Sequence, residues 1–169
     1  MGSSNIEIDN YMEKNFDGKF LGCFYADKLP HNPPPNSNLI ANYSDSDDND
    51  NGTHWVAMIN LNSDNGNPTL YFDSFGGDCG FEDIVLEKDT NFKRYMERHS
   101  RGNYARNNVN IQSRDGTTCG HYCVYAILKQ SIPLLTGQKR SANPAWKEFT
   151  SPFNDPEDND KRIRQLIKL

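Results

Sequence analysis

The chain has 169 residues and a mass of 19.3 kDa, which predicts a single domain spanning residues 1–169. Its 35% hydrophobic and 11% aromatic residues exclude a wholly disordered protein, and no apolar run approaches the roughly 18 residues of a membrane span. The net charge of -5 does not exclude nucleic acid, because residues 1–85 carry 3 Lys and Arg against 14 Asp and Glu, whereas residues 86–169 carry 15 against 9.

Hydrophobic periodicity predicts short strands among helices. The first helix is predicted over residues 5–15, where the apolar spacing partly follows the 3.6 period. Strands are predicted over 39–43, 55–61, 69–73 and 109–112, with 62–68 joining the middle two as a hairpin and 101–108 as a connection. Further helices are predicted over 81–99 with a break near 89–91, over 119–128, and over 160–169. The sum is an α+β fold, with a small central mixed sheet flanked by helices.

The four cysteines are candidates for catalysis or metal binding. The sequence shows no secretory signal, and the reducing interior of a cell keeps thiols free, so we expect no disulfide framework. The densest set of potential zinc ligands is Cys119, His121 and Cys123. On a helix, Cys119 and Cys123 share a face while His121 points away, so the sequence predicts no metal site.

Cys119 opens the most apolar predicted helix. At a helix N-terminus, unpaired backbone N–H groups and the helix dipole lower the pKa of a thiol, and the thiolate is the nucleophile. Gly116 and Gly120 leave space around the sulfur, and the Cys119 N–H is a potential oxyanion donor. The alternative is a buried, inert cysteine at the start of a core helix.

His54 is the best placed of the four histidines to act as a base. His31 lies in a Pro-rich loop, His99 at the end of a charged helix, and His121 on the helix of the thiol at the wrong angle. His54 opens one strand of the predicted hairpin and Asp73 ends the other, so the two are expected to lie within hydrogen-bonding distance. The alternatives are an exposed loop histidine and a turn carboxylate.

Gln112 ends the fourth predicted strand and is a candidate for the second oxyanion donor through its side-chain amide. A neutral polar residue at the end of a strand is unremarkable by itself. The chain order of a histidine, an acid, a glutamine and then a cysteine at a helix start favours the catalytic interpretation of all four residues.

This order resembles the adenovirus-type cysteine protease family, which is distantly similar to the SUMO-specific proteases. The matching elements are Gly52-Thr53-His54-Trp55, Leu70-Tyr71-Phe72-Asp73-Ser74-Phe75-Gly76, and Gln112 followed by Cys119-Gly120. The opening Met1-Gly2-Ser3-Ser4 and Phe20-Leu21-Gly22 also resemble that family, so the similarity extends to about residue 130 and leaves 131–169 as a variable C-terminal part. The resemblance implies a papain-like arrangement in which, unlike in papain, His precedes Cys in the chain.

The resemblance implies a viral cysteine endopeptidase. Such enzymes cleave capsid and core precursor proteins at Gly-containing, often Gly-Gly, sites during virion maturation, in the virion and the infected cell (virus factory or nucleus). It implies Cys119 as nucleophile, His54 as general base, Asp73 as the residue that orients His54, and Gln112 with the Cys119 N–H as oxyanion hole. The neighbouring candidates for substrate binding are Trp55 and Gly120.

The family also implies activating cofactors. DNA is one, and the candidate DNA-binding residues are Lys93, Arg94, Arg98, Arg101 and Arg106. The alternative for these residues is an ordinary solvated helix face. A viral peptide tethered by a disulfide is the other family cofactor, but no cysteine lies between Cys79 and Cys119, so we expect a non-covalent peptide or none. We expect a monomer that uses no metal or organic cofactor and does not bind membranes.

Two other functions remain open from the sequence. The first keeps the chemistry and changes the substrate to ubiquitin-like proteins, which also end in Gly-Gly, so that the chain would be a deubiquitinase- or deSUMOylase-like isopeptidase. The second is a non-catalytic relative that binds protein or DNA with the same scaffold. Reactivity of the Cys119 thiol at neutral pH separates the second alternative from the other two functions.

Overall fold

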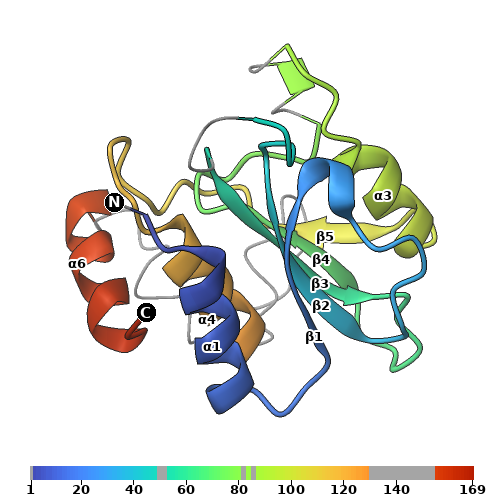
Figure 1. Ribbon diagram of the computed structural model, residues 1–169, viewed down its shortest axis with the longest axis horizontal. Coiled ribbons are helices and arrows are strands. Elements are labelled where there is room, and N and C mark those ends of the chain that lie inside the picture. The colour runs from blue at the N-terminus through green and yellow to red at the C-terminus, as the bar shows by residue number, and fades with distance from the viewer. Residues whose placement is uncertain (1, 49–52, 81–82, 85–86, 130–154) are drawn as a thin grey trace.

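The computed structural model describes residues 2–48, 53–80, 83–84, 87–129 and 155–169. These residues form an α+β fold in which four α-helices surround a five-stranded mixed sheet (Figure 1). The elements are α1 (Asn5–Asn15), β1 (Phe20–Tyr25), the 3-10 helix η1 (Ala26–Lys28), β2 (Ser37–Asn42), β3 (Trp55–Leu61), β4 (Thr69–Phe72), α3 (Phe92–His99), β5 (Tyr104–Arg106), α4 (Cys119–Lys129) and α6 (Pro156–Leu166).

The strands lie in the sheet in their order along the chain, from β1 to β5. β3 pairs antiparallel with both of its neighbours, β2 and β4. The edge strand β1 pairs parallel with β2, and the edge strand β5 pairs parallel with β4. The predicted hairpin of β3 and β4 is therefore confirmed. Helices α1, α4 and α6 lie on one side of the sheet and α3 on the other (Figure 1).

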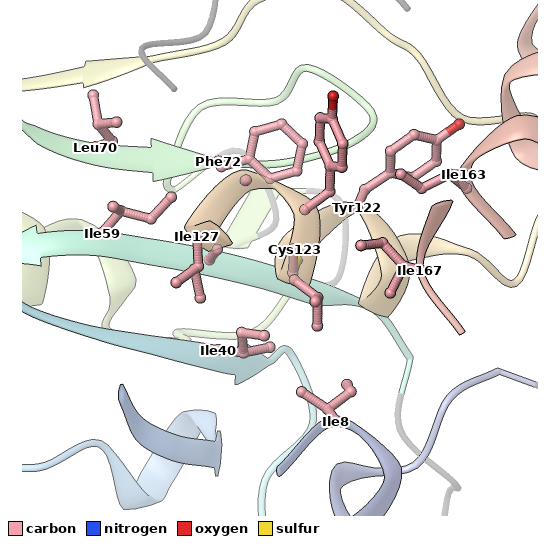
Figure 2. Close-up of a cluster of buried hydrophobic side chains, with 14 of the residues drawn as sticks. Ile8, Ile40, Ile59, Leu70, Phe72, Tyr122, Cys123, Ile127, Ile163 and Ile167 are labelled. Carbon is pink, nitrogen blue, oxygen red and sulfur yellow. The ribbon is translucent and has the colours of Figure 1, made fainter. Parts of the chain in front are cut away.

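The sheet is buried on both faces because alternate side chains of its central strands point to different helices. On one face Ile59 and Phe72 pack with Tyr122 and Ile127 of α4 and with Ile8 of α1, as Figure 2 shows. On the other face the core is formed by a second cluster that includes Met58, Tyr71, Phe92 and Met96. Burial of this apolar surface holds β3 and the start of α4 in a fixed relation.

Three elements match the sequence predictions closely. α1 has the predicted bounds, and its N-terminus is fixed by a capping box in which Ser4 and Glu7 bond reciprocally. β3 also has the predicted bounds. α4 begins at Cys119 as predicted and extends one residue further, to Lys129.

The edge strands were not predicted correctly. Residues 109–112 are not a strand; the fifth strand is β5, which lies within the stretch expected to be a connection. β1 was not predicted at all, since Gly22, with φ of 119°, and a register shift between Phe20 and Cys23 interrupt its alternation. Both strands are edge strands whose parallel partners are distant from them in sequence.

Two helix predictions need correction. The helix expected over 81–99 is α3 from Phe92 onward, and the predicted break near 89–91 is confirmed because these residues are not helical. Before the break, residues 83–84 are helical, and residues 81–82 and 85–86 lie outside the described residues. The C-terminal helix α6 starts at Pro156, four residues earlier than predicted, because Asp155 caps it and Pro156 occupies its first turn. Of the variable part 131–169, the structure describes residues 155–169.

Within the described ranges, none of the helices has the length and apolar character needed to cross a membrane.

Candidate active site

The β3–β4 hairpin brings His54 and Asp73 to one end of the sheet. His54 directly precedes β3 and Asp73 directly follows β4, and the antiparallel pairing of Ala57 with Phe72 brings both positions to the same end of the sheet. His54 Nε2–H donates to Asp73 Oδ1 at 2.7 Å, and both side chains are buried. The predicted contact between the two residues is therefore present.

Asp73 is fixed by a turn and by an asparagine that the sequence did not single out. The Asp73 backbone N–H donates to Asn107 Oδ1 at 3.0 Å, and Asn107 Nδ2 donates back to the Asp73 carbonyl. The N–H of Phe75 donates to Asp73 Oδ1 at 2.9 Å, and Gly76 N–H closes the turn onto the Asp73 carbonyl. Gly76 has φ of 77°, and a Cβ there would lie 2.8 Å from the Val109 backbone, so this turn requires glycine.

Aromatic side chains enclose the His54 ring. Phe75 stacks on it with ring centroids 4.7 Å apart, and Tyr43 meets it edge-on at 5.1 Å. The Tyr43 hydroxyl also donates to Asp73 Oδ2 at 3.3 Å. The ring is thereby shielded from water and held in one orientation, with Nε2 toward Asp73 and Nδ1 left for another partner.

That partner is Cys119, at the N-terminus of α4. Hydrogen bonding from the His54 ring, and from the backbone N–H groups of Trp55 and Gly120, favours the thiolate form of its sulfur. Burial by itself raises the pKa of the Cys119 thiol, but these bonds and the neighbouring His54 charge outweigh it and lower the pKa. The helix dipole acts in the same direction.

The pKa of His54 moves the opposite way. Burial favours the neutral ring, but the bonds to the Asp73 carboxylate and the Cys119 sulfur outweigh this effect and raise the pKa of His54 above its ordinary value of 6.5. A raised histidine pKa next to a lowered thiol pKa favours a buried imidazolium–thiolate pair. The thiolate then forms below the ordinary pKa of a thiol.

The other three cysteines lack this environment. All four cysteines are free thiols. Burial raises the pKa of Cys23 and of Cys123, and nearby Asp9 adds to the effect at Cys23. Cys79 is buried, with its sulfur 2.7 Å from the Tyr104 hydroxyl. Cys119 is therefore the thiol that the structure activates.

Gln112 lies in the loop that leads to Cys119. The prediction that it ends a strand is wrong. Its side chain is 1% exposed: Oε1 accepts from Ser74 Oγ at 2.6 Å, and Nε2 donates to the Gly116 carbonyl at 2.7 Å. An amide nitrogen carries two N–H groups, and the Gly116 carbonyl accepts one of those on Gln112. The structure fixes the amide between the turn after Asp73 and the segment before Cys119.

Trp55 and Gly120 both contact the N-terminal segment of the chain. The Trp55 indole N–H donates to the Ser3 carbonyl at 3.0 Å. A Cβ at Gly120 would lie 3.0 Å from Ile8 Cδ1 and 3.2 Å from Ser3 Cβ. The N-terminal segment therefore covers the Trp55 indole N–H and the Gly120 Cα. The backbone N–H groups of these two predicted substrate-binding residues face the Cys119 sulfur.

His121, on the same helix as the thiol, faces away from it. Its Nδ1 lies 3.1 Å from Ser3 Oγ, and burial is the main cause that lowers the pKa of His121 to about 4. It is therefore neutral at physiological pH and hydrogen-bonded to the N-terminal segment. Among the residues that the structure describes, no group of three or more His, Cys, Asp and Glu converges as metal ligands do.

The candidate DNA-binding residues lie in several surroundings. Arg101 and Arg106 line a cavity of about 860 Å³ at the turn of the β3–β4 hairpin, the end opposite His54 and Asp73. Arg94 forms an exposed ion pair with Asp89, and the Lys93 side chain lies against Gly80. Arg98 lines a smaller cavity of about 220 Å³, whose carboxylates are Asp27, Asp45 and Asp89. The structure brings Arg101 and Arg106 to one cavity, which Asp64 and Asp78 also line, and Arg106 pairs with Asp78. All the candidate residues but Arg101 therefore lie beside carboxylates or backbone, and Arg101 shares its cavity with carboxylates.

Comparison of the sequence with protein-family models found no match, and comparison with curated proteins found none either.

Proposed function

We propose that the protein is a cysteine endopeptidase of the adenovirus type, with the papain-like arrangement in which a helix N-terminus carries the nucleophile and a sheet carries the base. The observation that carries the proposal is the buried chain of hydrogen bonds from Asp73 through His54 to the Cys119 sulfur. A buried structural cysteine needs neither an imidazolium partner nor a lowered pKa. The same three groups in the same roles support acyl transfer through a thiolate.

The chemistry follows from the positions of these groups. The Cys119 thiolate attacks the scissile carbonyl carbon, and the negative charge that develops on the carbonyl oxygen is stabilised by the Cys119 N–H and the free N–H of Gln112. His54 then protonates the departing amine, so that the C–N bond breaks and a thioester remains. Water adds to the thioester with His54 as general base, which releases the acid and restores the thiolate.

The resemblance of the sequence supplies the proposed biology. We propose capsid and core precursor proteins as substrates, cleaved at Gly-Gly-like sites during virion maturation in the virion and infected cell. Viral DNA and a non-covalent peptide are the proposed activators. Arg101 and Arg106 lie together at one cavity, but Asp64 and Asp78 line it too, so the DNA part rests on the resemblance.

Cleavage of a Gly-Gly peptide taken from a capsid precursor tests the proposal. The wild-type chain is expected to cleave it and Cys119→Ala to lose all cleavage, while Cys79→Ala, a matched buried cysteine outside the site, retains it. A thiol-reactive peptide probe at neutral pH is expected to label Cys119 alone. Cleavage by Cys119→Ala at the wild-type rate overturns the proposal.

Two further arms separate the alternatives. An intact ubiquitin-like fusion processed faster than the capsid peptide identifies an isopeptidase. A wild-type chain that leaves Cys119 unlabelled while it binds DNA or a protein identifies a non-catalytic relative. Parallel reactions with and without DNA show whether DNA activates the enzyme.

A further inference from the structure

The loop of residues 111–118, which contains Gln112 and leads to Cys119, is held by the C-terminal helix α6. Asp160 of α6 is 9% exposed, and its carboxylate accepts four hydrogen bonds. Oδ2 accepts from the N–H and the hydroxyl of Ser113, and Oδ1 accepts from Thr118 Oγ1 at 2.8 Å and from the Tyr122 hydroxyl at 3.1 Å. One buried carboxylate thus binds both ends of the loop and the first turn of α4.

The donors around Asp160 are all neutral. Burial and the nearby Asp160 charge raise the pKa of Tyr122, so its hydroxyl stays protonated and donates. A buried charge bound only by neutral groups stabilises a fold less than well-packed apolar residues of the same volume would. Its value is therefore geometric: an acceptor-only group with two oxygens fixes the directions of four donors.

Gly116 shows how closely Asp160 approaches the loop. Ser113 and Gly116 form a turn closed by a 3.0 Å bond from Gly116 N–H to the Ser113 carbonyl. A Cβ at residue 116 would lie 2.3 Å from Asp160 Oδ2, so the carboxylate occupies the space that any other residue would fill. Glycine at position 116 therefore leaves room for the Asp160 carboxylate.

The same turn carries the acceptor that orients Gln112. The Gly116 carbonyl accepts the Nε2–H of Gln112 at 2.7 Å, and this bond sets where the second N–H of the amide points. Neighbouring residues of α6 support the loop as well: Asn159 Nδ2 donates to the Ile111 carbonyl at 3.1 Å, and Arg164 Nη2 donates to Thr117 Oγ1 at 2.8 Å.

We propose that Asp160 is a positioning residue of the oxyanion hole, which holds the Ser113–Gly116 turn so that the Gly116 carbonyl orients the Gln112 amide. The inference rests on the proposed protease function and deepens it. It assigns α6 a part in catalysis from a region where the resemblance to the family is poor. Asp160 lies outside the Asp73–His54–Cys119 chain of hydrogen bonds, so its effect is on the transition-state oxyanion and not on the thiolate.

The test compares two rates in Asp160→Asn. Peptide cleavage needs the oxyanion hole, whereas alkylation of Cys119 by iodoacetamide needs only the thiolate. Misplacement of a catalytic group by ~1 Å costs about 100-fold in rate, so kcat is expected to fall about 100-fold while KM and the alkylation rate at each pH stay at wild-type values. The matched control is Asp158→Asn on the exposed face of α6, where Asp158 pairs only with Lys161 among the described contacts.

Ser113→Ala is the milder variant if Asp160→Asn does not fold. It removes one partly exposed hydroxyl from the Asp160 carboxylate and leaves the other donors in place, so a smaller loss of kcat in the same pattern is expected. The double variant that combines Asp160→Asn with Gln112→Ala gives the decisive comparison. If Asp160 acts through Gln112, Asp160→Asn adds little to the loss of kcat that Gln112→Ala causes alone.

Three results overturn the inference. One is a kcat of Asp160→Asn equal to that of Asp158→Asn. Another is a fall in the alkylation rate parallel to the fall in kcat, which means that Asp160 supports the thiolate or the fold as a whole. The third is full additivity with Gln112→Ala. A wild-type chain that neither cleaves the peptide nor is alkylated at Cys119 overturns the proposed function itself, together with the inference that rests on it.

Discussion

Replacement of Asp73 by Asn tests the imidazolium–thiolate pair directly. The amide is nearly isosteric, and its oxygen can still accept from His54 Nε2–H and from Phe75 N–H, which lie 2.7 Å and 2.9 Å from Asp73 Oδ1 in the wild type. The variant therefore keeps the orientation of the His54 ring and removes the negative charge. At the Oδ2 position the amide NH2 replaces an acceptor, so the Tyr43 hydroxyl accepts there instead of donating. Any change in the titration of the pair then reports that charge.

The expected size follows from the bond that loses its charge. A hydrogen bond to a charged partner contributes about 1.5–3 kcal/mol and a neutral one about 0.5–1.5 kcal/mol. The difference of roughly 1–1.5 kcal/mol corresponds to about one pKa unit. The raised pKa of His54 is therefore expected to fall by about one unit, because the neutral amide stabilises the imidazolium less than the carboxylate does.

The assay is the pH dependence of kcat/KM for peptide cleavage. Its acid limb reports formation of the Cys119 thiolate, and its alkaline limb reports loss of the proton that His54 gives to the leaving amine. Asp73→Asn is expected to move the alkaline limb down by about one unit and not to raise the acid limb. The control is Asp78→Asn, a half-exposed carboxylate that pairs with Arg106. An alkaline limb that stays in place or moves up in the folded variant refutes the ion-pair argument.

Three other expected outcomes follow from the same contacts. Gln112→Ala removes an oxyanion donor and is expected to lower kcat about 10²–10³-fold with little change in KM; steady-state kinetics measure this, and an unchanged kcat contradicts the role. Between pH 6.5 and 9 the raised pKa of His54 and the lowered pKa of Cys119 oppose each other in the unfolding free energy. In Cys119→Ala the sulfur no longer raises the pKa of His54, and Asp73 remains as the group that raises it. The remaining contribution of His54 is complete below pH 6.5 and is lost as pH rises toward the folded-state pKa. Denaturant unfolding from pH 6 to 9 is expected to show the variant losing stability where the wild type does not, and equal slopes speak against it. Gly120→Ala places a methyl group 3.0 Å from Ile8 Cδ1, so it is expected to destabilise the fold by about 1–3 kcal/mol. Ile8→Val removes Cδ1, so the loss of stability in the double variant is expected to be less than the sum of the two single losses. Thermal unfolding of the three variants measures this, and full additivity contradicts the contact.

The sequence predicted the parts of the fold that depend on neighbouring residues. Helix α1, the central strand β3 with its hairpin, and the apolar helix α4 follow from local periodicity and turn residues. The prediction of a contact between His54 and Asp73 succeeded because two strands joined by a short turn leave few choices of pairing. The helix N-terminus at Cys119 followed from the glycine-containing loop before a strongly apolar run.

The tertiary structure alone decided the parts that depend on contacts distant in sequence. β1 and β5 are edge strands, stabilised by parallel partners that no local pattern reveals. Gln112 owes its orientation to Ser74 and Gly116 rather than to a strand. Asn107, which holds Asp73, and Asp160, which holds the loop before Cys119, are ordinary polar residues in the sequence. Their roles arise when burial removes water and makes each hydrogen bond a requirement, so only the folded chain shows which donors they satisfy.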